Sequence, residues 1–387
     1  MKRIHKCVRK MRLLGITAVL WISTLLAAEC EVCAAEMESS SEALESYDFQ
    51  EINEALREIF PEEKLDFREI VSAVISGDLT LTGELLNRLI GEQVAYAFAG
   101  CKDNLVHILL LAVVAAVFTN FSNVFQGKQM AEVSFYIIYL LLLALCLNSF
   151  QLVVDWTTEG VTRLTAFMTA FCPIYFLAVA IAKGSATAAA FYNLALFIIY
   201  FVELLIGKIL IPVVHLFLMV KVLNFLSPEE YLSKFAELLE TLVNWMLKTL
   251  LACIIGLNVV QGLIHPAIDT IKQSTVTRSA EAIPGIGDAI GGMTEVVIAT
   301  AVLTKNGIGL VGAIICFSIC LVPLIQAALL SLMYALATAV IQPISDKRVV
   351  GCVESVAQGC HMMMRIIFTM GMLFLLTIVI VCAVSGG

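Results

Sequence analysis

Ionisable side chains inside apolar runs are the first candidates for chemistry in this chain, because a charge in lipid is costly unless it has a role. Glu203 and Glu295 lie in such runs, and Lys305 follows ten residues after Glu295. We predict that Glu295 lines a polar cavity or pairs with Lys305. Glu203 precedes Gly207 and Lys208, so its carboxylate is equally well explained by a position near the membrane interface.

Two short motifs resemble those of enzymes, but their settings argue against catalysis. GIGD at 285–288 resembles the motif of intramembrane aspartyl proteases, yet no second aspartate stands beside a tyrosine in a neighbouring apolar run, and that chemistry needs two aspartates. GIGLVG at 307–312 matches a dinucleotide-binding pattern but opens an apolar run instead of following a strand. We therefore expect the glycines of both stretches, including Gly285, Gly287 and Gly291, to pack closely against neighbouring helices.

Other chemical signatures are also missing from the sequence. It has no GxxxxGK[ST] phosphate loop, so any ATP hydrolysis must belong to another protein. Cys352, Cys360 and His361 lie close together, but no fourth ligand is evident. We expect no enzymatic activity, no cofactor and no metal.

Prolines and glycines interrupt the apolar runs. The run from Gly307 to Gln342 has no charge and holds Pro323 near its middle. A membrane span needs about 20 apolar residues, so this run is too long for one simple span, and a proline kinks a helix. We predict a kinked, broken or re-entrant helical hairpin. Such interruptions, with Pro212 in an earlier run, are also how transporters build binding sites near the membrane midplane.

Composition defines the class. The chain is 60% hydrophobic and 14% charged, with a mean hydropathy of +0.93, whereas soluble domains are about 25% charged. We predict an all-α polytopic membrane protein with about seven to nine crossings, some broken or re-entrant. The predicted segments of this 105–387 membrane domain are 105–124, 133–154, 164–182, 186–206, 209–226, 246–264, 283–303, 307–342 and 362–384. Asp155 and Glu159 are predicted to lie outside the cytoplasm, between two spans.

The N-terminal third differs in character. Residues 1–35 have the basic start and apolar centre of a signal peptide, with an uncleaved anchor helix as the alternative. Residues 36–104 hold 16 acidic and 5 basic side chains and should form an extracytoplasmic helical segment. Phe49, Ile52 and Leu56 form an apolar stripe for packing on the membrane domain or a partner. Asp66 begins a second helix. The alternative is a solvated acidic lead-in.

An amphipathic helix is predicted over 228–245. Ser227 and Pro228 form its start. One face holds the apolar residues Tyr231, Phe235, Leu238 and Trp245. This helix should lie in the membrane interface or bind a partner.

Nearly the whole chain resembles one bacterial family. The stretches that carry the resemblance include FTNFSNVFQGKQMAEVSFYIIYLLLLAL, FMTAFCPIYF, SPEEYLSKFAELLETLVNW, VVQGLIHPAIDTIKQ and IPGIGDAIGGMTE. In order and spacing they resemble the stage III sporulation protein AE family of endospore-forming bacteria.

The resemblance implies a membrane subunit, either permease-like or a structural base, of a channel between mother cell and forespore. It implies several partners: an ATPase, ring-forming extracytoplasmic proteins and a forespore-side protein across the intermembrane space. It places the protein in the mother-cell-derived outer forespore membrane, with the N-terminal segment in the intermembrane space. It supplies no catalytic residue, and the acidic charge excludes nucleic acid as a partner. The alternative function is an autonomous secondary transporter of a small solute.

Overall fold

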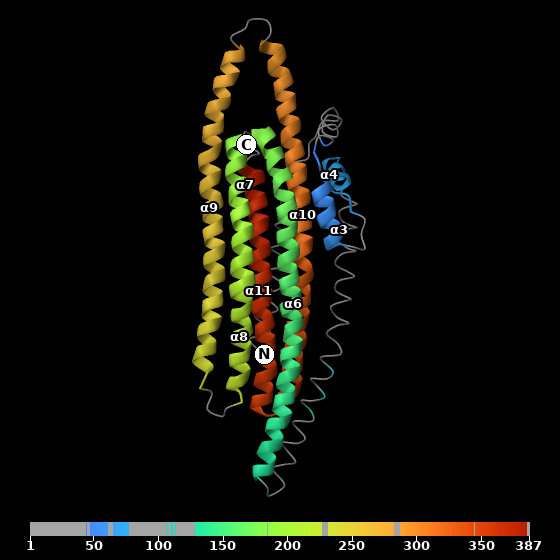
Figure 1. Ribbon diagram of the computed structural model, residues 1–387, viewed down its shortest axis with the longest axis vertical. Helices are drawn as coiled ribbons and strands as arrows, with labels where there is room; N and C mark the ends of the chain where they lie inside the picture. The colour runs from blue at the N-terminus through green and yellow to red at the C-terminus, as the bar shows by residue number, and fades with distance from the viewer. Residues whose placement is uncertain are drawn as a thin grey trace.

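The protein is an elongated helical bundle in a computed structural model (Figure 1). The described residues are 44, 47–60, 65–76, 106, 110, 113, 128–183, 185–226, 231–281, 287–343 and 345–384. Within these ranges, side chains are not described at 128–135, 138, 183, 186–187, 261–281 and 287–298. The signal-peptide region and most of the first predicted span lie outside the described residues.

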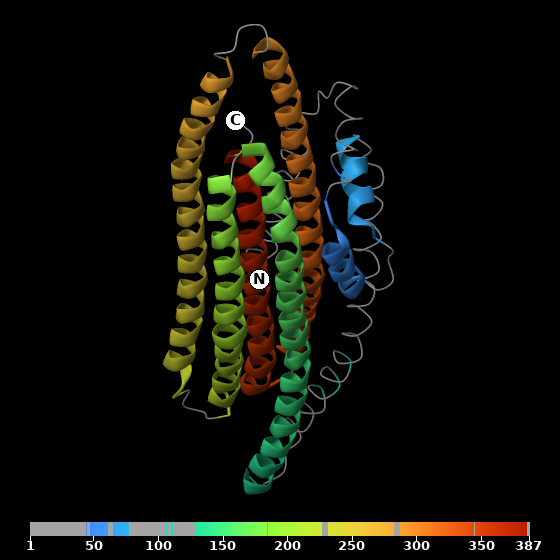
Figure 2. The same cartoon turned by 45° about the horizontal axis from the view of Figure 1, so that its top comes forward.

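Five helices in the described part are long and apolar enough to cross a membrane. They cover Tyr139–Ala182, Ala188–Asn224, Ser233–Val260, Ala299–Ile341 and Lys347–Ala383. Figure 2 shows them side by side along the length of the molecule. This is the predicted all-helical membrane class. A helix of 44 residues is about 66 Å long, roughly twice the hydrocarbon thickness of a bilayer.

Helix α6, Lys128–Lys183, runs through the predicted boundary between the spans 133–154 and 164–182. Two spans were predicted on either side of Asp155 and Glu159, but one uninterrupted helix contains both residues. Their charges do not end the helix because both have partners one turn away. Gln151 donates to Asp155 at 2.8 Å, and Arg163 pairs with Glu159 at 2.5 Å. Such spacings stabilise a helix surface.

Helix α10, Gly287–Ile341, corrects the predicted hairpin. It is a single helix with Pro323 inside it, so the run from Gly307 is neither broken nor re-entrant. Pro323 is buried, and a Cβ added to Gly160 of α6 would lie 2.9 Å from its ring. The missing side chain of Gly160 therefore makes room for the proline ring. This close packing stabilises α10 around Pro323, which on its own would weaken the helix.

The predicted break before Pro212 is also absent from the described chain. Helix α7, Ser185–Val202, continues through the π-helical segment η1, Glu203–Leu210, into α8, Ile211–Asn224. Within this transition the amide of Ile211 donates to the carbonyl of Ile206, five residues back. Proline has no amide hydrogen to donate, and a short π-helical segment is a common way to absorb such an irregularity.

Helix α9, Ser233–Glu281, joins two predicted elements. The amphipathic helix and the following span are one continuous helix at the edge of the bundle (Figure 1). Its predicted start at Ser227 and Pro228 lies outside the described residues. One end of α9 extends, together with α10, beyond the ends of α6, α7 and α11. Helix α11, Lys347–Val384, lies in the middle of the bundle.

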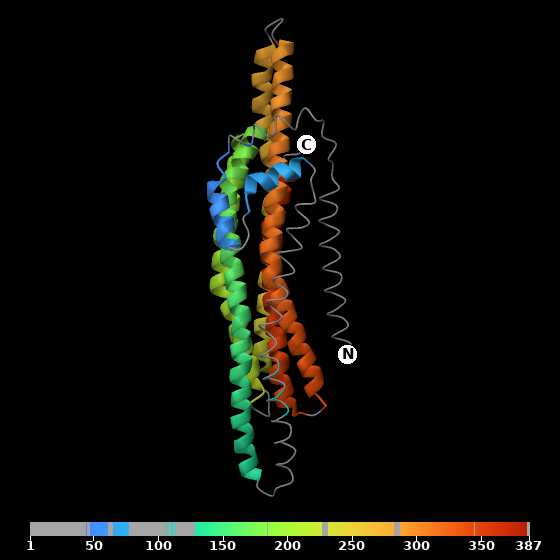
Figure 3. The ribbon, with the colours of Figure 1, turned by 90° about the vertical axis from the view of Figure 1, so that its right-hand side faces the viewer.

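Two short helices, α3, Gln50–Ile59, and α4, Phe67–Ile75, pack on the flank formed by α6 and α10 (Figure 3). Asp66 caps α4 as predicted, accepting a hydrogen bond from the amide of Arg68 at 2.9 Å. Asn53 of α3 accepts one from the amide of Phe67 at 2.9 Å. The bond between Asn53 and Phe67 joins the two short helices, whose apolar residues are buried.

Candidate functional site

Lys305 is the buried cation of the bundle interior. Its side chain has no exposed surface, and its ammonium donates to the carbonyl of Cys382 at 3.4 Å. Cys382 lies in the last turn of α11, where carbonyls lack helical partners and the helix dipole is negative. Lys305 thus stabilises the end of α11. The side chain of its predicted partner, Glu295, lies outside the described residues.

Tyr175 of α6 joins this end of the bundle to α11. Its hydroxyl lies 3.0 Å from the sulfur of Cys382 and donates to the carbonyl of Ile378 at 3.4 Å. Its ring stacks on Phe171, with centroids 5.1 Å apart. The tyrosine therefore combines a polar tie with an aromatic contact.

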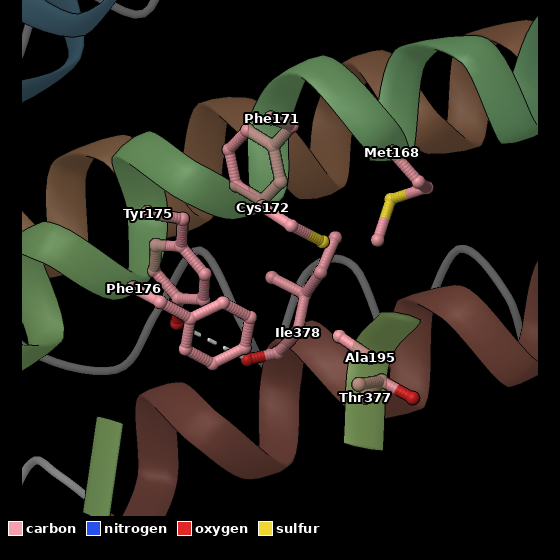
Figure 4. Close-up of a pocket in the computed structure, with 8 residues that line it drawn as sticks. All are labelled: Met168, Phe171, Cys172, Tyr175, Phe176, Ala195, Thr377 and Ile378. Atoms are coloured by element: carbon pink, nitrogen blue, oxygen red, sulfur yellow. Dashed lines mark hydrogen bonds between the residues drawn. The ribbon is translucent and has the colours of Figure 1, made fainter. Parts of the chain in front are cut away.

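A small cavity lies beside Tyr175 (Figure 4). Its lining residues are Met168, Phe171, Cys172, Tyr175, Phe176, Ala195, Thr377 and Ile378. It offers about 10 Å³ to the centre of a water-sized molecule, which is the space one water needs. This cavity is too small for a solute.

Glycines of α10 receive side chains from three neighbouring helices. A Cβ on Gly307 would lie 2.7 Å from Ile75 of α4, and one on Gly309 would lie 2.5 Å from the sulfur of Cys382. A Cβ on Gly312 would collide with the ring of Phe171. The dinucleotide-like pattern is thus a set of packing positions, as predicted.

Polar side chains tie the helices together at several levels. Asn258 of α9 donates to Thr377 of α11 at 3.4 Å. Arg365 of α11 donates to Asn244 of α9 at 2.6 Å. Lys221 of α8 donates to Gln358 of α11. Local sequence patterns do not reveal the bonds of Arg365 and Lys221, because their partners Asn244 and Gln358 lie more than a hundred residues away in the chain.

The remaining candidate cavity residues are not brought together. Glu203 and Pro212 are exposed on the bundle surface, at the start of η1 and just after it. Gly287 and Gly291 lie in the first turns of α10, and Gly285 lies outside the described residues. The described residues thus provide no shared pocket for this set.

The candidate partner-binding residues divide into two groups. Phe49, Ile52 and Leu56 are buried within the chain, so the molecule itself covers this stripe. The second group stays exposed at and just before the start of α9: Tyr231, two residues before the helix, is 75% exposed, Leu238 60% and Trp245 64%, with Phe235 also exposed. The α9 stripe, defined as these four residues, is the predicted partner surface that the structure leaves free.

The fold and its polar ties define a polytopic helical membrane protein whose interior is closed by helix packing. Residues 65–385 match the family model described as stage III sporulation protein AE, and the chain belongs to this family. A relative, stage III sporulation protein AE of Bacillus subtilis (strain 168), is 26% identical over 275 residues, covering 71% of this chain and 69% of the relative. No solved structure matches the chain.

Proposed function

We propose that this protein is a membrane subunit of a channel complex between mother cell and forespore, in the mother-cell-derived outer forespore membrane. It serves as the structural base or a permease-like part. Its partners are an ATPase, ring-forming extracytoplasmic proteins and a forespore-side protein across the intermembrane space. The segment 36–104 lies in the intermembrane space. Membership of a stage III sporulation family supports a role in sporulation.

The observation that carries the proposal is the contrast between a filled interior and an open surface. Neighbouring side chains pack into the space beside the glycines of α10, and the cavity at Tyr175 has room for one water. Large apolar side chains of the α9 stripe stay exposed. A protein built this way acts through what it binds at its surface. Exposed apolar patches mark contacts with protein or membrane.

The autonomous transporter is the competing function. Its support was a midplane site at broken helices, but α10 is continuous and α8 follows α7 through η1 without a gap. The candidate acid Glu203 is exposed instead of facing a cavity. These observations favour the channel subunit.

Affinity purification tests the proposal. A tagged chain is purified from detergent-solubilised sporulating cells, and co-purifying proteins are identified by mass spectrometry. We expect an ATPase and extracytoplasmic ring-forming proteins. A chain that purifies alone, under conditions where the complex survives the detergent, contradicts the proposal. Solute uptake by the purified chain in vesicles would then establish the transporter.

A further inference from the structure

Five helices share a band that is almost free of charge. It comprises residues 164–182 of α6, 188–202 of α7, 249–260 of α9, 299–320 of α10 and 366–383 of α11. Contacts across it place these segments at one level: Tyr175 with Ile378, Asn258 with Thr377, Lys305 with Cys382, and Phe176 with Tyr192 of α7. Nineteen residues of helix are about 28 Å long, which matches the hydrocarbon thickness of a bilayer.

The only charged residue in this band is Lys305, which is fully buried. On α7 and α9, the exposed residues of the band include Phe197, Tyr200, Leu257 and Val260. This α7–α9 flank has the surface that lipid requires. The band is therefore the part of the bundle that fits the hydrocarbon layer.

The opposite flank, formed by α6 with α3 and α4, has a different surface. The ring of Phe67 in α4 lies 6.3 Å from that of Phe171 in the band, and Ile75 fills the space over Gly307. Helices α3 and α4 are thus held at the level of the band, on the side away from α9 (Figures 1 and 3). Their exposed charged residues are Glu51, Glu54, Arg57, Glu58, Arg68 and Glu69.

Helix α6 continues this polar surface toward the middle of the bundle. Within the band α6 exposes Thr169 together with the apolar Leu177 and Ile181. Just beyond the edge of the band at Leu164, its exposed residues are Thr162, Thr158 and Glu159. The hydroxyls of Thr169 and Thr162 donate to carbonyls one turn back, and the carboxylate of Glu159 pairs with Arg163 at 2.5 Å while both side chains stay exposed to a large extent. Charged side chains at the depth of the hydrocarbon layer are tolerated where they face protein or a water-filled space.

We propose that the α3–α4–α6 flank borders a water-filled space that continues from the intermembrane space, where segment 36–104 is proposed to lie, to the depth of the bilayer, while the α7–α9 flank faces lipid. This inference rests on the proposed channel function, because one bundle covers only one side of such a space. Other subunits of the channel enclose the remaining sides. The wall of the aqueous passage is then the exposed face of α6 with α3 and α4. The buried core of the bundle serves as its support.

Cysteine accessibility tests the two flanks at one depth. Ala166→Cys and Thr169→Cys probe the α6 flank, and Phe197→Cys and Leu257→Cys are matched controls on the other flank, all at exposed positions of the band. Each full-length variant is made in sporulating cells. Open membrane fragments are treated with a charged, membrane-impermeant methanethiosulfonate, and labelling above that of the parent chain is timed. Denatured samples give the total thiol.

Because the reactive thiolate requires water, we expect the two α6 cysteines to react about tenfold faster or more than the two controls. Uniformly slow labelling would mean that the α6 flank is sealed from water. Uniformly rapid labelling would mean that the band lies outside the bilayer. Either result overturns the inference. If partners still co-purify in the affinity experiment, the proposed function stands without it.

Discussion

Helices α9 and α10 have similar lengths and both are apolar enough to span a membrane, yet the bundle uses them differently. In α10, side chains of neighbouring helices occupy the space beside Gly307, Gly309 and Gly312. In α9, a Cβ on Gly256 would meet nothing within 4 Å. Hydrophobicity alone therefore does not say whether a membrane helix holds the fold or presents a surface. The contacts made at its glycines distinguish these two roles.

The largest expected difference in stability between the two helices comes from adding one methyl group to a glycine of each. Gly312→Ala places a Cβ against the ring of Phe171, and overpacking of this kind costs about 1–3 kcal/mol. Gly256→Ala meets open space, so its stability should stay equal or rise by up to about 1 kcal/mol. Thermal unfolding of the detergent-purified variants measures the difference. Equal losses in both variants would contradict the division between the helices.

Replacing a lysine in each helix sharpens the comparison. Lys305→Met removes the ammonium that holds the end of α11, with an expected loss of about 1.5–3 kcal/mol. Lys248 is exposed on α9, so Lys248→Met should change stability by less than about 0.5 kcal/mol. The same unfolding assay applies. A neutral Lys305→Met would show that the buried lysine does not hold the bundle together.

A double-mutant cycle tests the tie that holds the edge helix. Asn244→Ala and Arg365→Met, alone and together, should reveal a coupling of about 1 kcal/mol between α9 and α11. The hydrogen bond between these two side chains is 2.6 Å long. Additive effects would mean that the bond contributes nothing to the position of α9.

The sequence predicted the class of the fold and several local features. Apolar run length predicted membrane helices, and the stripe through Ile52 and Leu56 is buried in α3 as its periodicity indicated. Asp66 begins α4 because a capping carboxylate acts within its own turn. Each of these predictions depends on neighbours in the chain, which sequence patterns report directly.

Breaks between helices were predicted poorly, because tertiary packing compensates for local break signals. Pro323 fits against Gly160, a residue more than 160 positions away, and no local pattern relates the two. Pro212 follows a π-helical segment that absorbs its missing hydrogen bond. Asp155 and Glu159 have partners within α6. For the candidate site, Glu203 was either a cavity residue or a residue near the membrane interface, and its exposed side chain fits the second of these predictions.

The smallest effect on stability and the largest on assembly are expected from the α9 stripe. Tyr231→Ser with Trp245→Ser alters two exposed side chains, so the unfolding free energy should change by less than about 0.5 kcal/mol per substitution. Phe197→Ser on α7 is the matched control, because Phe197 is also an exposed aromatic residue.

Quantitative mass spectrometry of proteins that co-purify with the wild-type chain, the double variant and the Phe197→Ser control tests the central claim most directly. If the protein acts through its surface, the double variant loses the ATPase and ring proteins while the control retains them. Equal recovery in all three samples would show that the α9 stripe is not the partner surface. Recovery of no partner by the wild-type chain would contradict the channel-subunit account itself.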